Sequence, residues 1–317
     1  MQPDSSTAPG GAPLHALLAQ AQTQISSVIK GKASQVADCV ACLVAGGHLL
    51  IEDLPGVGKT TLAQALSITL GLKFSRTQFT ADLLPSDLLG VNMFERQSGQ
   101  FVFKPGPVFA QVLLADEINR AGPKTQSALL EAMEERQVTI EGVSHPLPSP
   151  FFVIATQNPS EQLGTYPLPE SQLDRFLMTI HLGYPDREAE RALLSSGDSR
   201  EQLATLQPVM TAAQLQQAQA AAKSLHISPA LLDYVQLLLE ATRGGQWSTE
   251  GLSPRAGLAW LRAARAKALL AGRAHVSPDD VQSSAVQVLA HRMKPRAGSG
   301  RGSAEQVRAM IEALPLP

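Results

Sequence analysis

The stretch IEDLPGVGKTT, residues 51 to 61, decides the fold expected for the whole chain. It follows the phosphate-loop pattern G-x-x-x-x-G-K-[ST], except that Asp53 stands at the first glycine position. In such a loop, glycines let backbone N–H groups approach phosphate oxygens, the lysine adds positive charge and the hydroxyl ligates Mg²⁺. Thr60 carries that hydroxyl. The residues expected to hold a nucleotide are Pro55, Gly56, Val57, Gly58, Lys59, Thr60 and Thr61.

Asp53 is the departure from the pattern. The first position requires mainly a turn conformation, and aspartate tolerates left-handed backbone angles better than most residues. A carboxylate facing a triphosphate would be repelled, so we expect the Asp53 side chain to point away from the phosphates. Nucleotide binding that survives Asp53→Gly would fit this interpretation, whereas a marked tightening would not.

Apolar runs surround the loop. The run HLLIE at 48–52 precedes it, a helical pattern follows it, and three further runs at 111–117, 151–158 and 175–182 read as buried strands. A helical stretch at 124–137 lies between the first two of these runs. Strands that alternate with helices predict a parallel sheet covered on both faces.

The rest of the chain divides by composition. Residues 1–12 are turn formers without periodicity, and helical patterns follow at 13–29 and 33–46. After about Pro185 only helices are expected, three of them opened by Ser-Pro in ISPALL, LSPRAG and VSPDDV. AGSGRGS, at 297–303, predicts a mobile loop. The expected organisation is a disordered tail, an α/β domain and a helical domain, at residues 1–12, 13–184 and 185–317.

Composition limits the function classes. The 317 residues are 44% hydrophobic and 17% charged, which is typical of a globular protein, and the net charge of -2 gives no global basic field for nucleic acid or anionic lipid. The apolar runs are too short to span a membrane and the N-terminus lacks a basic signal region, so we expect a cytoplasmic protein. Cys39 and Cys42 form a C-x-x-C that could be redox-active or half a metal site. Their helical context, without a second pair, favours two small buried residues.

Polar residues stand where two predicted strands end. In VLLADE, strand alternation would send Asp116 and Glu117 to different sides, so that one can hold Mg²⁺ while the other meets an attacking water. Asn158 ends FFVIATQN, and carboxyl ends of parallel strands gather at one edge, where ligands bind. The plainer alternatives are an acidic strand end in solvent and an Asn-Pro turn.

At this point the sequence resembles a known family. The segments GVGKTT, LLADEINRAGPKTQSALLEAMEERQVTI, FFVIATQNPSEQLGTYPLPESQLDRFLM and LSPRAGLAWLRAARAKALLAGRAHVSPDDV look like the MoxR family of AAA+ ATPases, over residues 13–290. The resemblance implies a Mg²⁺-dependent ATP hydrolase. It also implies an AAA+ P-loop core, with a parallel five-stranded sheet flanked by helices, followed by an all-α lid domain.

The resemblance also implies roles that spacing alone does not show. Arg175, in LDRF, matches the position from which AAA+ proteins reach the γ-phosphate of the neighbouring subunit, and Arg255, in SPRAG, matches the sensor arginine of the lid. A salt bridge from Arg175 to Asp174 or Glu170, and a plain surface role for Arg255, are the alternatives. Val28 and Ile29, in VIKG, resemble an adenine-pocket segment, although a hydrophobic staple would look the same.

The family also suggests partners. It implies a homo-oligomeric ring, expected to be hexameric, that remodels or activates a client protein, together with a partner carrying a von Willebrand factor A domain. Predicted hairpins at 90–109 and 137–149 could contact a client or pack within the ring. One rival is a binding switch with slow hydrolysis. The other is a DNA motor using a basic patch at Arg292, Lys294, Arg296 and Arg301.

Overall fold

The computed structural model describes residues 12–158, 164–196, 199–294 and 302–316. The tail predicted over residues 1–12 and the loop predicted over 297–303 fall almost entirely outside these ranges, so both stay predictions. Within the described parts, no helix is long and apolar enough to cross a membrane.

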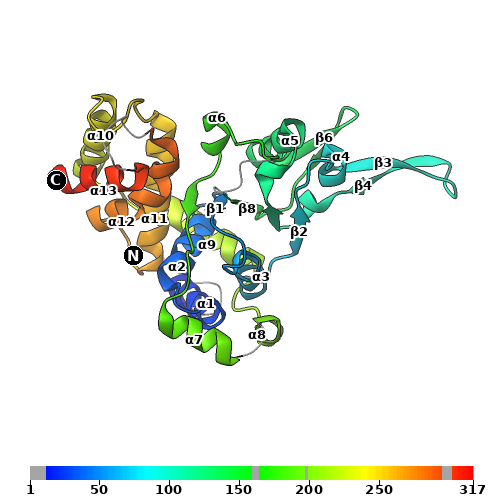
Figure 1. The fold of residues 1–317 in the computed structure, drawn as a ribbon, viewed down its shortest axis with the longest axis horizontal. Helices are drawn as coiled ribbons and strands as arrows, with labels where there is room; N and C mark the ends of the chain where they lie inside the picture. The colour runs from blue at the N-terminus through cyan, green and yellow to red at the C-terminus, as the bar shows by residue number, and fades with distance from the viewer. Residues whose placement is uncertain (1–11, 159–163, 197–198, 295–301, 317) are drawn as a thin grey trace, which may run out of the picture.

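A five-stranded parallel sheet forms the centre of the molecule (Figure 1). Its strand order is β2-β5-β8-β1-β9, in which β1, the strand before the phosphate loop, lies between β8 and β9. Strands that are neighbours in this sheet do not have consecutive numbers in the chain, so crossover connections join them. This confirms the predicted α/β fold. The strands are β1 (Leu49–Glu52), β2 (Phe74–Gln78), β5 (Val112–Asp116), β8 (Phe152–Gln157) and β9 (Met178–Ile180).

Successive side chains of a strand point to opposite faces of a sheet. Here an apolar cluster packs against each face, so both faces are buried. In β1, Leu49 and Ile51 belong to one apolar cluster and Leu50 to another. The first cluster also takes in α1, α2 and α3, and the second takes in α5. The helices of this part are α1 (Leu14–Val28), α2 (Ala33–Val44), α3 (Lys59–Thr69), α4 (Pro85–Leu89), α5 (Pro123–Glu135) and α6 (Glu170–Leu173), with 3-10 turns η1 (Pro107–Phe109) and η2 (Ile118–Arg120).

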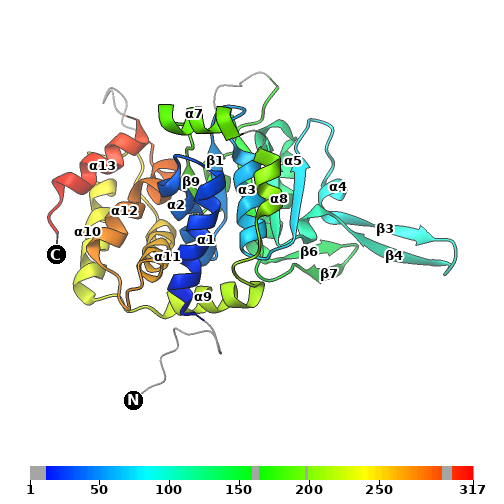
Figure 2. The same ribbon diagram turned by 90° about the horizontal axis from the view of Figure 1, so that it is seen from below.

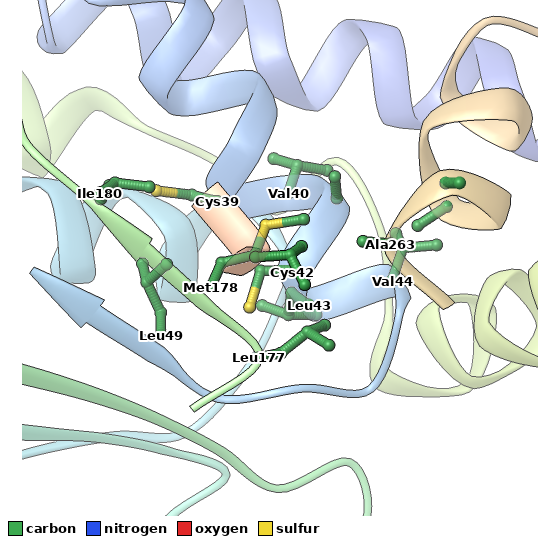
Figure 3. Close-up of a cluster of buried hydrophobic side chains, with 14 of the residues drawn as sticks. Cys39, Val40, Cys42, Leu43, Val44, Leu49, Leu177, Met178, Ile180 and Ala263 are labelled. Atoms are coloured by element: carbon green, nitrogen blue, oxygen red, sulfur yellow. The ribbon is translucent and has the colours of Figure 1, made fainter. Parts of the chain in front are cut away.

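Cys39 and Cys42 lie on α2 inside the first cluster, among the side chains of β1 and β9 (Figure 3). Both are free thiols with no exposed surface, and burial raises the pKa of each. The part of the chain described here contains no cluster of His, Cys, Asp and Glu suited to a metal. The expectation of small buried residues therefore agrees with the structure.

Among the described residues after β9, the regular elements are all helices, apart from a bridge between His226 and His275. The three Ser-Pro pairs open helices as predicted: the hydroxyls of Ser228 and Ser253 accept backbone N–H groups of the first turn, and Ser277 forms a capping box. These helices are α7 (Arg187–Ser196), α8 (Ser199–Thr205), α9 (Ala212–Ser224), α10 (Pro229–Arg243), α11 (Pro254–Leu270), α12 (Pro278–Leu289) and α13 (Ser303–Ala313), with a 3-10 turn η3 (Ala290–Arg292).

Two hairpins project together from the end of the molecule opposite the C-terminal helices (Figure 2). They are β3 (Gly90–Glu95) with β4 (Gln100–Pro105), and β6 (Gln137–Ile140) with β7 (Val143–Pro146), so both predicted hairpins are present. The ring of Phe103 stacks on that of His145 at 4.0 Å between centroids, which ties the hairpins together. Beyond this contact Phe94 and Phe101 are 56% and 71% exposed.

Candidate functional site

The phosphate loop joins β1 to α3. Gly56 and Gly58 have φ of 83° and 92°, and Gly58 is the N-cap of α3. These left-handed angles suit glycine, because a Cβ makes them costly. A Cβ added at either position would meet no atom within 4 Å, so the space over the loop is open to a ligand. The first turn of α3 begins at Lys59, and the N-terminus of a helix directs its first backbone N–H groups toward such a space.

Asp53 does not have the left-handed conformation on which its prediction was based, so that reason was wrong. Its two carboxylate oxygens instead accept backbone N–H groups, one from Gly183 at 2.6 Å and one from Leu54 at 3.0 Å. Asp53 is only 8% exposed and each of its carboxylate oxygens accepts one N–H group, which fits a side chain turned from the phosphates. The Lys59 ammonium donates to the carbonyl oxygens of Asp53 and Leu54, at 2.7 and 3.1 Å.

Three adjacent strands bring the predicted nucleotide-binding residues together. In the order β5-β8-β1, the carboxyl end of β1 leads into the phosphate loop, and β8 leads into the buried Asn158. The backbone N–H of Asp53 donates to the carbonyl of Gln157, so Asn158 follows directly beside the loop. Asp116 ends β5 on the other side of β8. Residue Asn158 thus follows the strand that lies between the loop strand and the strand ending in Asp116.

Glu117 lies outside the strand, which corrects the argument from strand alternation. Strand β5 ends at Asp116, and Glu117 has a left-handed backbone with φ of 57°. Such an angle is uncommon for a residue with a Cβ and concentrates at functional sites. The left-handed backbone, rather than the pleat, separates the two carboxylates.

Three residues that the sequence analysis did not select hold these acids. Gln78 donates to the Glu117 carboxylate at 2.8 Å, Arg76 pairs with Asp116 at 2.8 Å, and the Thr156 hydroxyl donates to Asp116 at 2.6 Å. Arg76 and Gln78 belong to β2, which was not predicted as a strand. Its sequence, FSRTQ, has no apolar run, although alternate positions along it do lie on one face.

The parallel strands all begin at one side of the sheet, here called the amino edge, and all end at the other, the carboxyl edge, where the phosphate loop lies. Arg175 lies at the amino edge, opposite the phosphate loop. It stands in the turn between α6 and β9, not in a strand as predicted, because β9 begins only at Met178. The N–H of Leu177 donates to the carbonyl of His48, level with the start of β1. From His48 to Asp53 the chain advances five residues, roughly 16 Å at about 3.3 Å each. Arg175 cannot reach the nucleotide of its own loop.

Arg255 lies beside Arg175. Glu134, at the end of α5, bridges the two guanidinium groups at 3.1 and 3.0 Å, so neither salt bridge proposed for Arg175 is present. Asp174 approaches Arg255 at 3.5 Å and is itself held by the buried Arg292 at 2.7 Å. The structure therefore brings Arg175 and Arg255 together and separates both from Lys59.

The cluster opens onto a cavity of about 190 Å³. Five arginines and two acids line it, so positive charge is in excess. Burial lowers the pKa of both Arg136 and Arg262, and each donates to backbone carbonyls rather than to a carboxylate. This edge is therefore suited to an anionic group presented from outside. The charged residues are Arg136, Arg175, Arg255, Arg262, Arg292, Glu134 and Asp174.

Two further predictions concern residues away from both edges. Val28 and Ile29 are 3% and 8% exposed and pack in the first apolar cluster, so their adenine role stays a prediction. Of the proposed basic patch, the Arg292 side chain is only 5% exposed, and Lys294 pairs with Glu170 and Glu250. Arg296 and Arg301 lie outside the described residues. The described half of the patch offers little free charge to a nucleic acid.

Comparison with known proteins identifies the family. Residues 48–178 match the model of the ATPase family associated with various cellular activities (AAA), and residues 241–312 match the AAA lid domain. The chain is 44% identical to "Uncharacterized protein YeaC" of Bacillus subtilis, over 96% of each chain. It is 41% identical to "Chaperone MoxR1" of Mycobacterium tuberculosis, over 90% of this chain and 78% of the relative.

A solved structure supports the same conclusion. The crystal structure of a candidate ATPase from Cytophaga hutchinsonii superposes with a TM-score of 0.87 at 35% identity, covering 96% of each chain. Family model, relatives and solved structure together support an AAA domain followed by a helical lid. The chain belongs to the MoxR family of AAA+ ATPases.

Proposed function

We propose that this protein binds ATP with Mg²⁺ and hydrolyses it at the interface between two copies of the chain. The observation that carries the proposal is the separation of the site between two edges of one sheet. Lys59, Asn158, Asp116 and Glu117 gather at the carboxyl edge, whereas Arg175 lies with Arg255 at the amino edge. A triphosphate that touches both sets must lie between neighbours.

The chain's own residues suit an ATP site at the carboxyl edge. The open backbone at Gly56 and Gly58 would cradle phosphate oxygens, and Lys59 would exchange its two carbonyl partners for them. The hydroxyl of Thr60 and the carboxylate of Asp116 would hold Mg²⁺, which usually keeps one or two protein ligands beside substrate phosphates. When bound, that ion neutralises charge that develops on the phosphates.

Glu117 and Asn158 supply the remaining chemistry of this edge. We assign Glu117 as the base that takes a proton from the attacking water, and Asn158 as the amide that orients this water against the γ-phosphate. In the free subunit the Glu117 carboxylate is occupied by Gln78 and Arg120, at 2.8 Å each. Both contacts are made to Oε2, so these partners hold the carboxylate through one of its two oxygens.

The amino edge completes the site of the neighbour. Arg175 and Arg255 would reach the γ-phosphate of the next subunit, where a guanidinium is worth about 10³ to 10⁵ in rate. A face that meets a different face of its neighbour repeats around a ring. We propose a closed homo-oligomer, which the family suggests is hexameric, in the cytoplasm.

The output of hydrolysis is a change in a partner protein. The relative from M. tuberculosis bears the name chaperone, and the exposed Phe94 and Phe101 offer an apolar tip for a client protein. A partner with a von Willebrand factor A domain is part of the same proposal. We further propose that residues 13–184 form the nucleotide-binding domain and 185–317 the lid domain, within which the matched lid region lies.

Subunit mixing tests the proposal. Lys59→Ala removes the loop charge of one copy and Arg175→Ala removes the finger of another, and each variant alone should lose ATP turnover. In mixed assemblies, some interfaces pair the intact loop of the Arg175→Ala chain with the intact arginine of the Lys59→Ala chain. Turnover should return on mixing. Co-assembled but inactive mixtures would argue against a shared site.

The rival functions predict different results. A nucleotide-operated switch predicts that Glu117→Gln turns ATP over at the rate of the unmodified protein while binding it normally. A DNA motor predicts sub-micromolar, steeply salt-dependent binding of DNA in fluorescence anisotropy. The ion pairs of Lys294 and the 5% exposed side chain of Arg292 argue against the DNA motor.

A further inference from the structure

One hydroxyl group contacts both acids of the candidate ATP site. Thr156, in β8, has no exposed surface. Its Oγ1 donates to Oδ1 of Asp116 at 2.6 Å and accepts the backbone N–H of Glu117 at 2.8 Å. A hydroxyl has one proton to donate and lone pairs to accept, so a single side chain can serve both neighbours.

The contact with Glu117 replaces a strand hydrogen bond. Strands β5 and β8 are paired through Ala115 and Ala155, and the chain leaves the ladder after Asp116. Glu117 then adopts its left-handed angle, which persists only where the surroundings hold it. The Thr156 hydroxyl gives the Glu117 N–H an acceptor at this point. The turn that directs the Glu117 side chain is thereby held from the adjacent strand.

The contact with Asp116 directs its carboxylate. The bond of 2.6 Å is in the range of a charge-assisted hydrogen bond from a hydroxyl to an ionised oxygen. The other carboxylate oxygen accepts from Arg76, which is half exposed and free to move aside. Partners of this kind orient metal-ligating carboxylates, and their removal commonly costs about 10- to 100-fold in metal affinity or activity.

We propose that Thr156 is a positioning residue for both acids. Its hydroxyl sets the direction of the Asp116 carboxylate toward Mg²⁺ and holds the backbone turn that presents Glu117 to water. This inference rests on the proposed function, since it concerns the same site. The inference goes beyond the proposed function because it names a residue that touches neither nucleotide nor metal.

Thr156→Val tests the inference, since valine keeps the shape and removes the hydroxyl. The Mg²⁺ concentration for half-maximal binding of a fluorescent ATP analogue should rise by about 10- to 100-fold. Binding of the same analogue in EDTA should stay unchanged, because the phosphate loop is untouched. Thr156→Ser keeps the hydroxyl and should restore the Mg²⁺ dependence, and Thr156→Ala gives the same comparison should valine not fold.

Thr179→Val is the matched control. Thr179 is a buried threonine of β9 in the same sheet, and its hydroxyl makes no hydrogen bond among the described residues. The Thr179→Val variant should leave the Mg²⁺ dependence of nucleotide binding unchanged. A folded Thr156→Val with the dependence of the unmodified protein, or a Thr156→Ser as defective as valine, overturns the inference alone. An unmodified protein without Mg²⁺-dependent nucleotide binding overturns the proposed function and this inference with it.

Discussion

Replacement of Arg292 by methionine should destabilise the protein strongly. The Arg292 side chain is only 5% exposed, and its guanidinium binds the Asp174 carboxylate at 2.7 Å. It also donates to the backbone carbonyls of Asp174, Phe176, Leu177 and Val288. One buried side chain therefore joins the end of α12 to the turn that carries Arg175. Methionine keeps much of the apolar stem and removes every one of these donors.

The magnitude follows from burial. Breaking a buried ion pair by removing one partner costs about 3–5 kcal/mol, because a charge and several acceptors are left without donors. Asp174 is 24% exposed and retains its contact with Arg255 at 3.5 Å, so the loss should lie near the lower value, about 3 kcal/mol. For a domain of this size, that loss corresponds to a fall of roughly 5 to 10 °C in Tm.

Equilibrium unfolding in urea at pH 7.5 provides the measurement, with Lys294→Met as the control. Lys294 stands two residues further along the chain and forms ion pairs with Glu170 and Glu250, but on the surface. Exposed pairs contribute little, since solvent screens them. Arg292→Met should shift the unfolding midpoint clearly and Lys294→Met should not. Equal shifts would show that burial does not decide the strength of these pairs.

Four further variants test other parts of the structure. Burial, and secondarily Arg136, lowers the pKa of His48 to about 3, so the unfolded chain binds more protons between about pH 3 and 6.5. The contribution of His48 should lower the free energy of unfolding by about 1.4 kcal/mol between pH 7.5 and 5.5. In urea unfolding, the His48→Gln variant should lack this part of the pH dependence. Gly58→Ala should weaken binding of a fluorescent nucleotide about tenfold, because a Cβ makes φ of 92° costly. Phe101→Ser should leave Tm unchanged, whereas Phe103→Ser should lower it.

Much of the fold was predictable because its signals are local. The apolar runs at 48–52, 111–117 and 151–158 contain buried strands, and Gly99, with φ of 66°, turns the first hairpin where alternation required it. Serine before proline opened three helices, because that pair satisfies the first-turn N–H groups and fits the proline ring.

The rest depends on contacts between distant segments. Strand β2 has only one large apolar residue, so its membership of the sheet depends on pairing with β5 rather than on its own pattern. The left-handed angle of Glu117 ends a strand that periodicity would have continued. The sequence of α5 does not indicate that Glu134 bridges Arg175 and Arg255. Arg255 lies 121 positions after Glu134 in the chain.

The bridge at Glu134 also bears on how neighbouring subunits could meet. In the free subunit, its two carboxylate oxygens each accept from one guanidinium, at 3.1 and 3.0 Å. A phosphate group presents oxygens to the same planar donors and carries more negative charge. Docking of a neighbour's γ-phosphate would therefore exchange one charged partner of Arg175 and Arg255 for another. Their pairing with Glu134 is thus compatible with the proposed role on a neighbour's nucleotide, since phosphate oxygens would take the place of the carboxylate.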